Sequence, residues 1–306
     1  MIKYSVCIAT YKRQELLKKL VDSLLNQNNI DLSEVELIIV DNDDKGSARK
    51  IVDSYFGKVS CDLSYEIQPE KNIAITRNIA VKKALGDYIF FVDDDEYADE
   101  NWMYTHINNL LKYNADGAIG RVKSYFHTDA PKWITECPVY HRDATPSGTI
   151  PALLNTGNCM IKSEFFIKKG YNFDPKYGIS GGSDHHLFSK LISDGARFVS
   201  CFEAITYEFV TSERANIKWL VKRVFRTGNN FTRTYIVKND KQSIVLSFAE
   251  FFKGIVQAIM ALLLSVFFIW NRTKSFHWFL RAVSNIAKPF AVIGIYPDEY
   301  KEQKIR

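Results

Sequence analysis

The sequence predicts an α/β fold in which a mostly parallel central sheet lies between helices, followed by a helical C-terminal region. Within the first hundred residues, short runs that are apolar throughout alternate with segments of helical periodicity. This alternation is typical of βαβ units, whose parallel sheet is covered on both faces. The last ninety residues change character and contain a basic amphipathic segment and two apolar ones. With 306 residues, of which 46% are hydrophobic and 25% charged, the chain has the composition of a globular protein and room for one large domain with an appendage.

The individual elements are predicted from hydrophobic periodicity. Strands are expected at 4–10, 35–40, 63–67 and 87–92, and the helices between them at 13–26, 47–56 and 75–85. Further along the chain, helices are expected at 101–112 and 185–193, strands at 117–122, 153–161 and 197–207, a surface loop at 131–151, and a glycine-rich turn at 177–184.

The charge of the chain is distributed unevenly. Residues 214–306 contain 16 lysines and arginines against 5 aspartates and glutamates, a net charge of +11. The preceding 213 residues contain 24 against 30, a net charge of −6. Such asymmetry indicates a polyanionic partner surface, which could be a nucleic acid or an anionic lipid.

The cysteines and the N-terminus indicate a reducing compartment. Five cysteines are scattered along the chain without a Cys-x-x-Cys pair, which argues against a disulfide framework or a structural zinc site. The apolar run at 6–9 is too short for the hydrophobic part of a secretory signal.

The C-terminal region predicts a membrane anchor. Residues 216–228 form an amphipathic helix with cations at every fourth position. Residues 254–271 contain no charge, but these 18 positions are at the lower limit for a spanning helix, which needs about 20 apolar residues. Residues 275–295 mix aromatic residues with two cations and a proline, a pattern that suits a membrane interface. Cations flank both ends of the uncharged segment, so we predict a peripheral or monotopic anchor; a buried helical hairpin is the alternative.

Three consecutive aspartates, Asp93, Asp94 and Asp95, follow the apolar strand predicted at 87–92. Carboxylates so close together repel one another, and a divalent cation relieves the repulsion. Hard oxygen ligands suit Mg²⁺ or Mn²⁺, which usually keep water and substrate phosphates as their other ligands. A solvated acidic turn that caps a helix is the alternative, but the position at a strand end favours the metal.

Thr10 and Asp41 also follow the last apolar residues of predicted strands. Because ligands bind outside the carboxyl ends of parallel strands, Thr10, Asp41 and Asp93 are expected at one edge of the sheet. A carboxylate at position 41 can accept hydrogen bonds from a ribose or a base. The loop at 9–13 has no glycine, and no dinucleotide or P-loop motif occurs, which argues against hydride-transfer and P-loop enzymes. The remaining possibility is an enzyme that holds a nucleotide through a metal ion and side chains.

Arg77 and Asp184 lie near the starts of two predicted helices. Arg77 can reach a phosphate or a base carbonyl, or it can form a surface salt bridge. Asp184 follows a turn with paired glycines at 181 and 182, which allow a substrate to approach the backbone. Asp184 is either a helix N-cap or a general base.

Taken in order, these features resemble glycosyltransferase family 2, with the nucleotide-diphospho-sugar transferase (GT-A) fold. The resemblance covers 3–213 and is carried by SVCIATYKRQELLKKLVDSLLNQ, ELIIVDND, NIAITRNIAVKKALGDYIFFVDDDE, NTGNCMIKSEFF and GISGGSDHHLFSKL. The tail, ITYEFVTSERANIKWLVKRVFRTGN followed by an apolar stretch and IGIYPDEY, resembles the bacterial exopolysaccharide or capsule branch of that family. The resemblance implies a nucleotide-sugar-binding half at 1–97, an acceptor-binding half of the same domain at 98–213, and a membrane-associating region at 214–306.

The resemblance also assigns roles to single residues. Those expected at the donor nucleotide are Thr10, Tyr11, Arg13, Asp41, Arg77, Asp93 and Asp94. Asp95 is expected to bind the metal directly, and Asp93 to assist it near the ribose. Asp184 matches the catalytic base, although Ser183 stands where the family normally has a glutamate. Weaker contacts with the acceptor or a diphosphate are expected from Gly182, His185, Arg214, Arg223 and Arg226, for which a solvated helix surface is the alternative.

The activity implied by the resemblance is that of an inverting, metal-dependent, hexosyltransferase-type enzyme. It would move a sugar from a UDP-sugar to a hydroxyl of a glycan, with Mn²⁺ or Mg²⁺ as cofactor. The expected acceptor is linked to a polyprenyl diphosphate at the cytoplasmic face of the inner membrane, with an anionic membrane surface and no nucleic acid as partner. Two alternatives are a sugar nucleotidyltransferase, whose glycine- and lysine-containing first loop is missing, and a non-catalytic membrane-associated scaffold, which would not need four converging aspartates.

Overall fold

The computed structural model describes residues 1–126, 130–142, 145–151, 154–238 and 244–297, without the side chains of 142, 234–238 and 244–247. The chain divides into two compact units, which we describe separately. Unit 1 comprises Met1–Lys123, Arg142–Ile179 and Ser183–Glu208. Unit 2 comprises Ser124–His141, Ser180–Gly182 and the described residues from Phe209 onwards.

Strands and helices alternate along the first part of the chain, and long helices end it. In chain order the elements are β1 (Tyr4–Thr10), α1 (Gln14–Leu24), η1 (Leu32–Glu34), β2 (Val35–Asp41), α2 (Arg49–Asp53), β3 (Asp62–Ile67), α3 (Ile73–Lys83), β4 (Tyr88–Val92), β5 (Glu96–Ala98), α4 (Trp102–Lys112), β6 (Gly117–Phe126), α5 (Lys132–Thr135), η2 (Pro138–Tyr140), β7 (His141–Arg142), β8 (Asn158–Lys162), α6 (Glu164–Ile167), η3 (Pro175–Tyr177), α7 (Ser183–Ser193), β9 (Phe198–Val210), α8 (Ile217–Lys238), α9 (Ile244–Phe267) and α10 (Arg272–Val292). Every strand and helix predicted for the first hundred residues is present.

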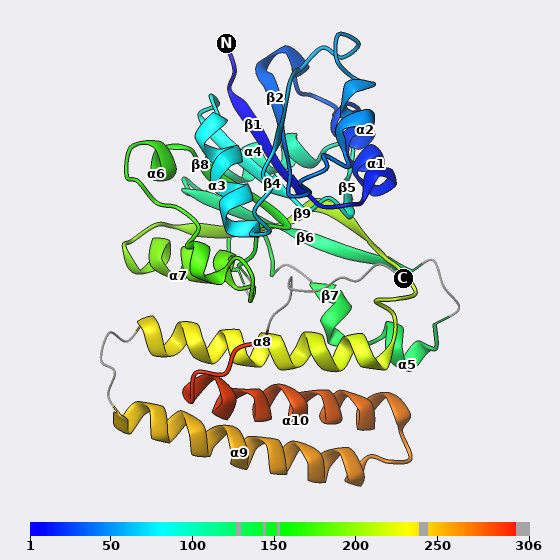
Figure 1. Cartoon of the computed structure of the whole chain (residues 1–306), viewed down its shortest axis with the longest axis vertical. Coiled ribbons are helices and arrows are strands. Elements are labelled where there is room, and N and C mark those ends of the chain that lie inside the picture. Colours follow the sequence, from blue (N-terminus) through cyan, green and yellow to red (C-terminus); the bar gives the residue numbers. More distant parts are fainter. Residues whose placement is uncertain (127–129, 143–144, 152–153, 239–243, 298–306) are drawn as a thin grey trace. The chain divides into compact units, whose positions relative to one another are not determined.

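Unit 1 is built on a sheet with the strand order β3-β2-β1-β4-β8-β6-β9-β5, and β7 pairs with β6 off this path (Figure 1). The strands β3, β2, β1 and β4 run parallel, as predicted. In the other half, β8 is antiparallel to both β4 and β6, and β5 is antiparallel to β9. The sheet is therefore parallel in its first half and mixed as a whole. The sequence did not show this because the hydropathy of a buried strand such as β8 does not reveal its direction.

Both faces of the sheet are covered by helices, which explains why the strands are apolar throughout. Successive side chains of a strand point to opposite faces. In β1, Val6 and Ile8 belong to a core cluster that includes residues of α1, α2 and α4. Cys7, between them, belongs to a second cluster with residues of α3, α6 and α7.

The structure differs from the predicted elements mainly between 131 and 161. The predicted surface loop contains the short elements α5, η2 and β7. The strand predicted at 153–161 is confined to β8, and residue 153 lies outside the described residues. Short elements of this kind have too few residues to show a hydrophobic period in the sequence.

Unit 2 contains the three long helices α8, α9 and α10. The central helix is α10, which packs against both α8 and α9 (Figure 1). Glycines allow both approaches: a Cβ on Gly228 of α8 would lie 2.0 Å from the carbonyl oxygen of Ser284, and one on Gly254 of α9 would lie 2.7 Å from Cδ of Pro289. By length and composition alone, one helix among the described residues, Phe248–Phe267, could cross a membrane.

Candidate active site

The parallel strands end at one edge of the sheet and bring predicted polar residues together there. Thr10 and Asp41 are register partners at the ends of β1 and β2. Asp93 directly follows β4, in which Phe91 pairs with Cys7 of β1. The hydroxyl of Thr10 donates a hydrogen bond of 2.8 Å to Oδ2 of Asp94, which joins the ends of β1 and β4.

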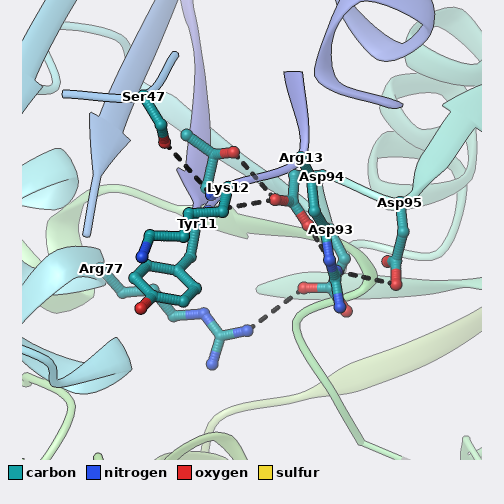
Figure 2. Close-up of polar contacts among 9 residues, drawn as sticks. Tyr11, Lys12, Arg13, Ser47, Arg77, Asp93, Asp94 and Asp95 are labelled. Atoms are coloured by element: carbon teal, nitrogen blue, oxygen red, sulfur yellow. Dashed lines mark hydrogen bonds and ion pairs between the residues drawn. The ribbon is translucent and has the colours of Figure 1, made fainter. Parts of the chain in front are cut away.

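Asp94 is buried and holds the loop that follows β1 (Figure 2). Besides Thr10, the backbone N–H of Tyr11 donates to its Oδ2 at 3.3 Å, and Nη1 of Arg13 lies 2.7 Å from its Oδ1. Burial raises the pKa of Asp94, and the positive charge of Arg13 opposes this shift. Both oxygens of Asp94 accept hydrogen bonds inside the protein, so Asp94 fixes the conformation of the predicted nucleotide-binding loop.

Asp95 shares the same guanidinium group. Nη1 of Arg13 lies 2.9 Å from Oδ2 of Asp95, and the Asp95 side chain is almost fully buried. The pKa of Arg13 is raised above its ordinary value, chiefly by the charge of Asp94, so the guanidinium remains a cation. One arginine thus neutralises part of the charge of two neighbouring carboxylates.

Asp93 is the most open of the three aspartates. Its side chain is 38% exposed, against 7% for each of the other two. Nη2 of Arg77, on α3, lies 3.2 Å from its Oδ1, as Figure 2 shows. A Cβ on Gly157 would lie 3.2 Å from Oδ2 of Asp93, so glycine at this position leaves the carboxylate accessible.

These carboxylates suit a metal that takes only part of its coordination from the protein. Among the described residues, no group of three or more His, Cys, Asp or Glu side chains could hold a metal ion. Asp93 and Asp95 can each offer an oxygen, and Mg²⁺ or Mn²⁺ commonly completes its coordination with water and substrate phosphates. The donor set therefore fits a metal that binds together with a diphosphate.

Asp41 is fully buried and closes the loop after β2. Its oxygens accept hydrogen bonds from the backbone N–H groups of Ala48 at 2.7 Å and Asp43 at 3.0 Å, and from the hydroxyl of Tyr65 at 2.9 Å. Burial, together with the bond to Asp41, raises the pKa of Tyr65. The predicted contact of Asp41 with a base or ribose stays a prediction, since in the structure this carboxylate organises the loop.

Tyr11 is flanked by two lysines, neither of which was predicted as a site residue. The ammonium nitrogen of Lys71 lies 4.7 Å from the centre of the Tyr11 ring, and that of Lys12 lies 5.1 Å from it. An aromatic ring between two cations can stack on a planar group and attract a negatively charged one. Lys71 follows β3 without a motif that would have identified it in the sequence.

Asp184 lies in the first turn of α7 and is partly exposed. Its Oδ1 accepts a hydrogen bond of 2.8 Å from the backbone N–H of His185, which is also partly buried. The thiol of Cys159 in β8 has a raised pKa, chiefly through burial, and Arg77, Asp93 and Asp184 all act on it electrostatically. Asp184 is thus in the same region of unit 1 as Asp93 and Arg77.

Helix α3, which carries Arg77, also holds the segment that leads to α7. Asn72 caps α3 by accepting hydrogen bonds from the N–H groups of Ala74 at 3.1 Å and Ile75 at 3.2 Å. Its amide donates to the carbonyl of Pro175 at 3.0 Å. A Cβ on Gly178 would lie 1.6 Å from Oδ1 of Asn72, so only glycine fits there.

A second asparagine of α3 repeats this contact. Asn78 Nδ2 donates to the carbonyl of Phe173, and its Oδ1 accepts from the N–H of Phe173, both at 2.8 Å. Asn72 and Asn78 were not predicted from the sequence, because their partners lie about a hundred residues further along the chain.

Gly182 belongs to unit 2. Its φ of +93° is in the left-handed region that favours glycine. A Cβ on Gly182 would lie 3.2 Å from the side chain of Asn230 on α8, so the turn passes close to that helix.

Three predicted arginines also belong to unit 2. The guanidinium carbons of Arg214 and Arg223 lie 5.1 Å and 5.9 Å from the centre of the Trp219 ring. Arg226 follows on α8 and is partly buried. Arg214 and Arg223 thus form a basic group with the Trp219 ring in unit 2, whereas the aspartates belong to unit 1.

A sequence profile described as "Glycosyl transferase family 2" matches residues 5–170, which include the aspartates at the sheet edge and Arg77. The chain belongs to glycosyltransferase family 2. It is therefore a glycosyltransferase, and the family expected from its motifs is confirmed. The match gives no support to a sugar nucleotidyltransferase or a non-catalytic scaffold.

This family 2 glycosyltransferase is similar to the succinoglycan biosynthesis protein ExoM of Rhizobium meliloti (strain 1021). The two chains are 29% identical over 232 residues, which are 74% of this chain and 73% of ExoM. ExoM acts in the synthesis of a bacterial polysaccharide, which agrees with the branch that the tail resembles.

Two crystal structures of residues 1–349 of Staphylococcus aureus TarS have the same fold. The complex with UDP gives a TM-score of 0.56 at 15% identity and covers 95% of this chain and 90% of that one. The complex with UDP-GlcNAc gives a TM-score of 0.55 at 14% identity and covers 94% and 91%. The predicted GT-A fold is confirmed.

Proposed function

We propose that this enzyme is an inverting, metal-dependent glycosyltransferase that transfers a sugar from a UDP-sugar to a lipid-linked glycan in bacterial polysaccharide synthesis. The observation that carries the proposal is the open carboxylate of Asp93, which lies 3.2 Å from Nη2 of Arg77. Asp184 belongs to the same part of unit 1, since Asp93 and Asp184 both act electrostatically on Cys159. An open carboxylate beside an arginine suits a diphosphate bound through a cation. The polysaccharide assignment is supported by the similarity to ExoM.

A UDP-sugar is the proposed donor because TarS, which has the same fold, was crystallised with UDP and with UDP-GlcNAc. In this chain Asp94 fixes the loop at 10–13 by three contacts. The ring of Tyr11 can stack on the uracil. The ammonium groups of Lys12 and Lys71 beside it attract the diphosphate.

Asp184 is the proposed general base. It takes the proton of the acceptor hydroxyl while the hydroxyl oxygen forms a bond to the anomeric carbon from the side opposite the diphosphate. The bond between the anomeric carbon and the diphosphate oxygen breaks, and UDP leaves with the electron pair. The configuration at the anomeric carbon is inverted without a covalent intermediate. Arg77 stabilises the negative charge on the departing diphosphate.

Asp95, assisted by Asp93, would hold Mn²⁺ or Mg²⁺, and the metal would supply further positive charge to the leaving diphosphate. We expect EDTA to abolish UDP release and added Mn²⁺ or Mg²⁺ to restore it. Binding of Mn²⁺ in the presence of UDP, measured by electron paramagnetic resonance, should be lost in Asp95→Asn. Full activity in EDTA would refute the metal dependence.

The proposed acceptor is a glycan on a polyprenyl diphosphate, at the cytoplasmic face of the inner membrane. The net charge of +11 in residues 214–306 supports an anionic partner surface. Lysines and arginines near an anionic membrane contribute roughly 1 kcal/mol each to binding. Arg214 and Arg223, around Trp219, are suited to bind a diphosphate.

The function is tested by measuring UDP release and sugar transfer with a panel of nucleotide sugars and a polyprenyl-diphosphate glycan. Asp184→Asn should lower transfer about 10²–10⁴-fold, as expected for loss of a general base. The Kd for UDP, measured by calorimetry, should stay within about twofold. Asp53→Asn, at an exposed position in α2, is the matched control and should be fully active. Full transfer by Asp184→Asn would refute its role, and transfer from no nucleotide sugar would refute the proposed function.

A further inference from the structure

Helix α9 has its small residues inside and its large apolar residues outside. Gly254, Ala258, Ala261 and Ser265 are buried, at the spacing of one helix face. Within Phe248–Phe267 only 22% of the residues are buried, although mean hydropathy reaches 1.7. A surface helix of a water-exposed protein shows the reverse arrangement, with its large apolar residues toward the core.

The exposed apolar residues form a surface that we call the outer face of α9. Among them, six residues that are each 54–65% exposed are Phe252, Ile259, Met260, Leu263, Val266 and Phe267. Trp270, just beyond the end of α9, is 72% exposed. Contiguous exposed apolar surface of this kind marks an interaction site, and tryptophan at its end is typical of a membrane–water interface.

Side-chain hydrogen bonds fix α9 to α10 at two places. Ser265 and Ser275 exchange hydrogen bonds, each hydroxyl donating to the other residue's carbonyl at 2.9 Å and 2.8 Å. Near the middle of α9, Oε1 of Gln257 accepts a hydrogen bond of 2.7 Å from the ammonium group of Lys288. The two helices therefore move as one hairpin, and any position of α9 in a membrane also places α10.

Helix α10 carries cations along its length, namely Arg272, Lys274, Arg281 and Lys288. Arg281, near its middle, is exposed and lies over the ring of Trp278. At 24 residues α9 is about 36 Å long and could cross a bilayer. A crossing would carry Arg281 of the attached α10 into the hydrocarbon, where a charged side chain is strongly disfavoured.

From these contacts we infer that α9 lies in the plane of an anionic membrane surface, with its outer face among the upper acyl chains and α10 on the headgroup side. The inference deepens the membrane location proposed above for the enzyme. A helix in the interface plane buries its apolar face in the lipid and keeps cations near the headgroups. The excess of cations in residues 214–306 is complementary to anionic lipid, which favours a bilayer over a second copy of this basic chain.

Binding is tested by flotation of the full chain with vesicles of phosphatidylglycerol and phosphatidylethanolamine, without substrate. Met260→Glu combined with Leu263→Glu should lower the partition coefficient at least tenfold, because the inferred position would bring two carboxylates among the acyl chains. Both side chains are exposed, so the substitutions should not disturb the fold. Leu85→Glu combined with Leu111→Glu, at exposed positions of unit 1, is the matched control and should bind like the wild type. Binding that persists in 1 M NaCl supports the apolar contact, and complete release by salt overturns it.

Orientation is tested with single cysteines at Phe252, Ile259 and Val266, seven residues apart on the outer face. Each is labelled with an environment-sensitive fluorophore and quenched by lipids carrying spin labels at known depths. An in-plane helix gives one shallow depth for all three labels. A deep middle label with the two ends in opposite leaflets overturns the inference, as does an α9-dependent dimer in solution that does not bind vesicles.

Failure of this inference is distinguishable from failure of the proposed function. Vesicle binding is measured without donor or acceptor, and Asp184→Asn should bind vesicles like the wild type. Sugar transfer without vesicle binding would overturn the orientation of α9 and leave the enzyme assignment standing. Vesicle binding without any sugar transfer would overturn the enzyme assignment and leave the position of α9 standing.

Discussion

Gly178→Ala tests the contact through which α3 holds the segment leading to Asp184. The backbone of Gly178 has φ −72° and ψ −21°, which alanine adopts freely, so the effect of the substitution is steric. Its Cβ would lie 1.6 Å from Oδ1 and 2.3 Å from Cγ of Asn72. Asn72 must move and lose its cap of α3, worth about 1 kcal/mol, and its bond to Pro175, worth about 1 kcal/mol. With strain of about 1 kcal/mol from overpacking, the free energy of unfolding should fall by about 2–4 kcal/mol.

The assays for this variant are thermal unfolding and steady-state kinetics. A loss of about 2–4 kcal/mol in a protein of this size lowers the midpoint by roughly 5–10 °C. The segment held by Asn72 leads to Asp184, and a displacement of a catalytic group by about 1 Å can lower turnover about 10²-fold. We therefore expect kcat to fall by a larger factor than the KM for the nucleotide sugar rises.

Asn72→Ala provides the control, because it removes the atoms with which the new methyl group collides. In that background Gly178→Ala should change stability by less than about 0.5 kcal/mol, so the two substitutions should be coupled by more than about 1 kcal/mol. Additive losses, or an unchanged Gly178→Ala variant, would refute the reasoning.

Three further predictions concern ionisable groups of unit 1. Arg77→Met should raise the Kd for UDP about 10–100-fold by calorimetry, while Lys83→Met, on the same helix but paired with Glu66, should leave it unchanged. Arg13→Met should destabilise the chain by about 3–5 kcal/mol at pH 8, because Asp94 is left buried without its cation. Since burial already raises the pKa of Asp94, this loss should shrink as the pH falls toward 5; an equal loss at both pH values would contradict it. Burial lowers the pKa of His106 to about 4, so unfolding takes up a proton between pH 6 and 4. Between pH 6 and 4 the free energy of unfolding should fall by up to about 1.4 kcal/mol per pH unit more in the wild type than in His106→Gln. Parallel curves of stability against pH for the two proteins would contradict this.

The meeting of Thr10, Asp41 and the three aspartates could be predicted because it follows from topology. Carboxyl ends of neighbouring parallel strands share an edge, whatever side chains they carry. The direction of β8 could not be predicted in the same way. A strand buried on both faces is apolar whether it runs parallel or antiparallel. The described part of the connection from β6 to β8 contains the short elements α5, η2 and β7, which show no clear period in the sequence.

The function of each carboxylate at that edge could not be read from the sequence. Asp41 is engaged by backbone N–H groups of its own loop, and Asp94 by the loop after β1. Asp93 is more exposed than its two neighbours, and Gly157, sixty-four residues later, places no side chain beside it. Such differences depend on tertiary contacts and not on the local pattern, in which the three consecutive aspartates look alike.

The arginines at the edge neutralise the three aspartates only in part, which bears on the proposed metal. Asp93, Asp94 and Asp95 carry three negative charges, and Arg13 and Arg77 contribute two positive ones, so these five residues together remain negative. Arg13 contacts the two buried carboxylates, and Arg77 lies 3.2 Å from Oδ1 of the open one. A diphosphate that approaches Asp93 therefore meets the negative charge of this carboxylate beside the cation of Arg77. A divalent cation between the two would reverse the sign of the local charge, so UDP and Mn²⁺ should bind cooperatively, and in Asp93→Asn the affinity for UDP should depend less on the metal. Equal Kd values for UDP with and without Mn²⁺ in the wild type would contradict this argument.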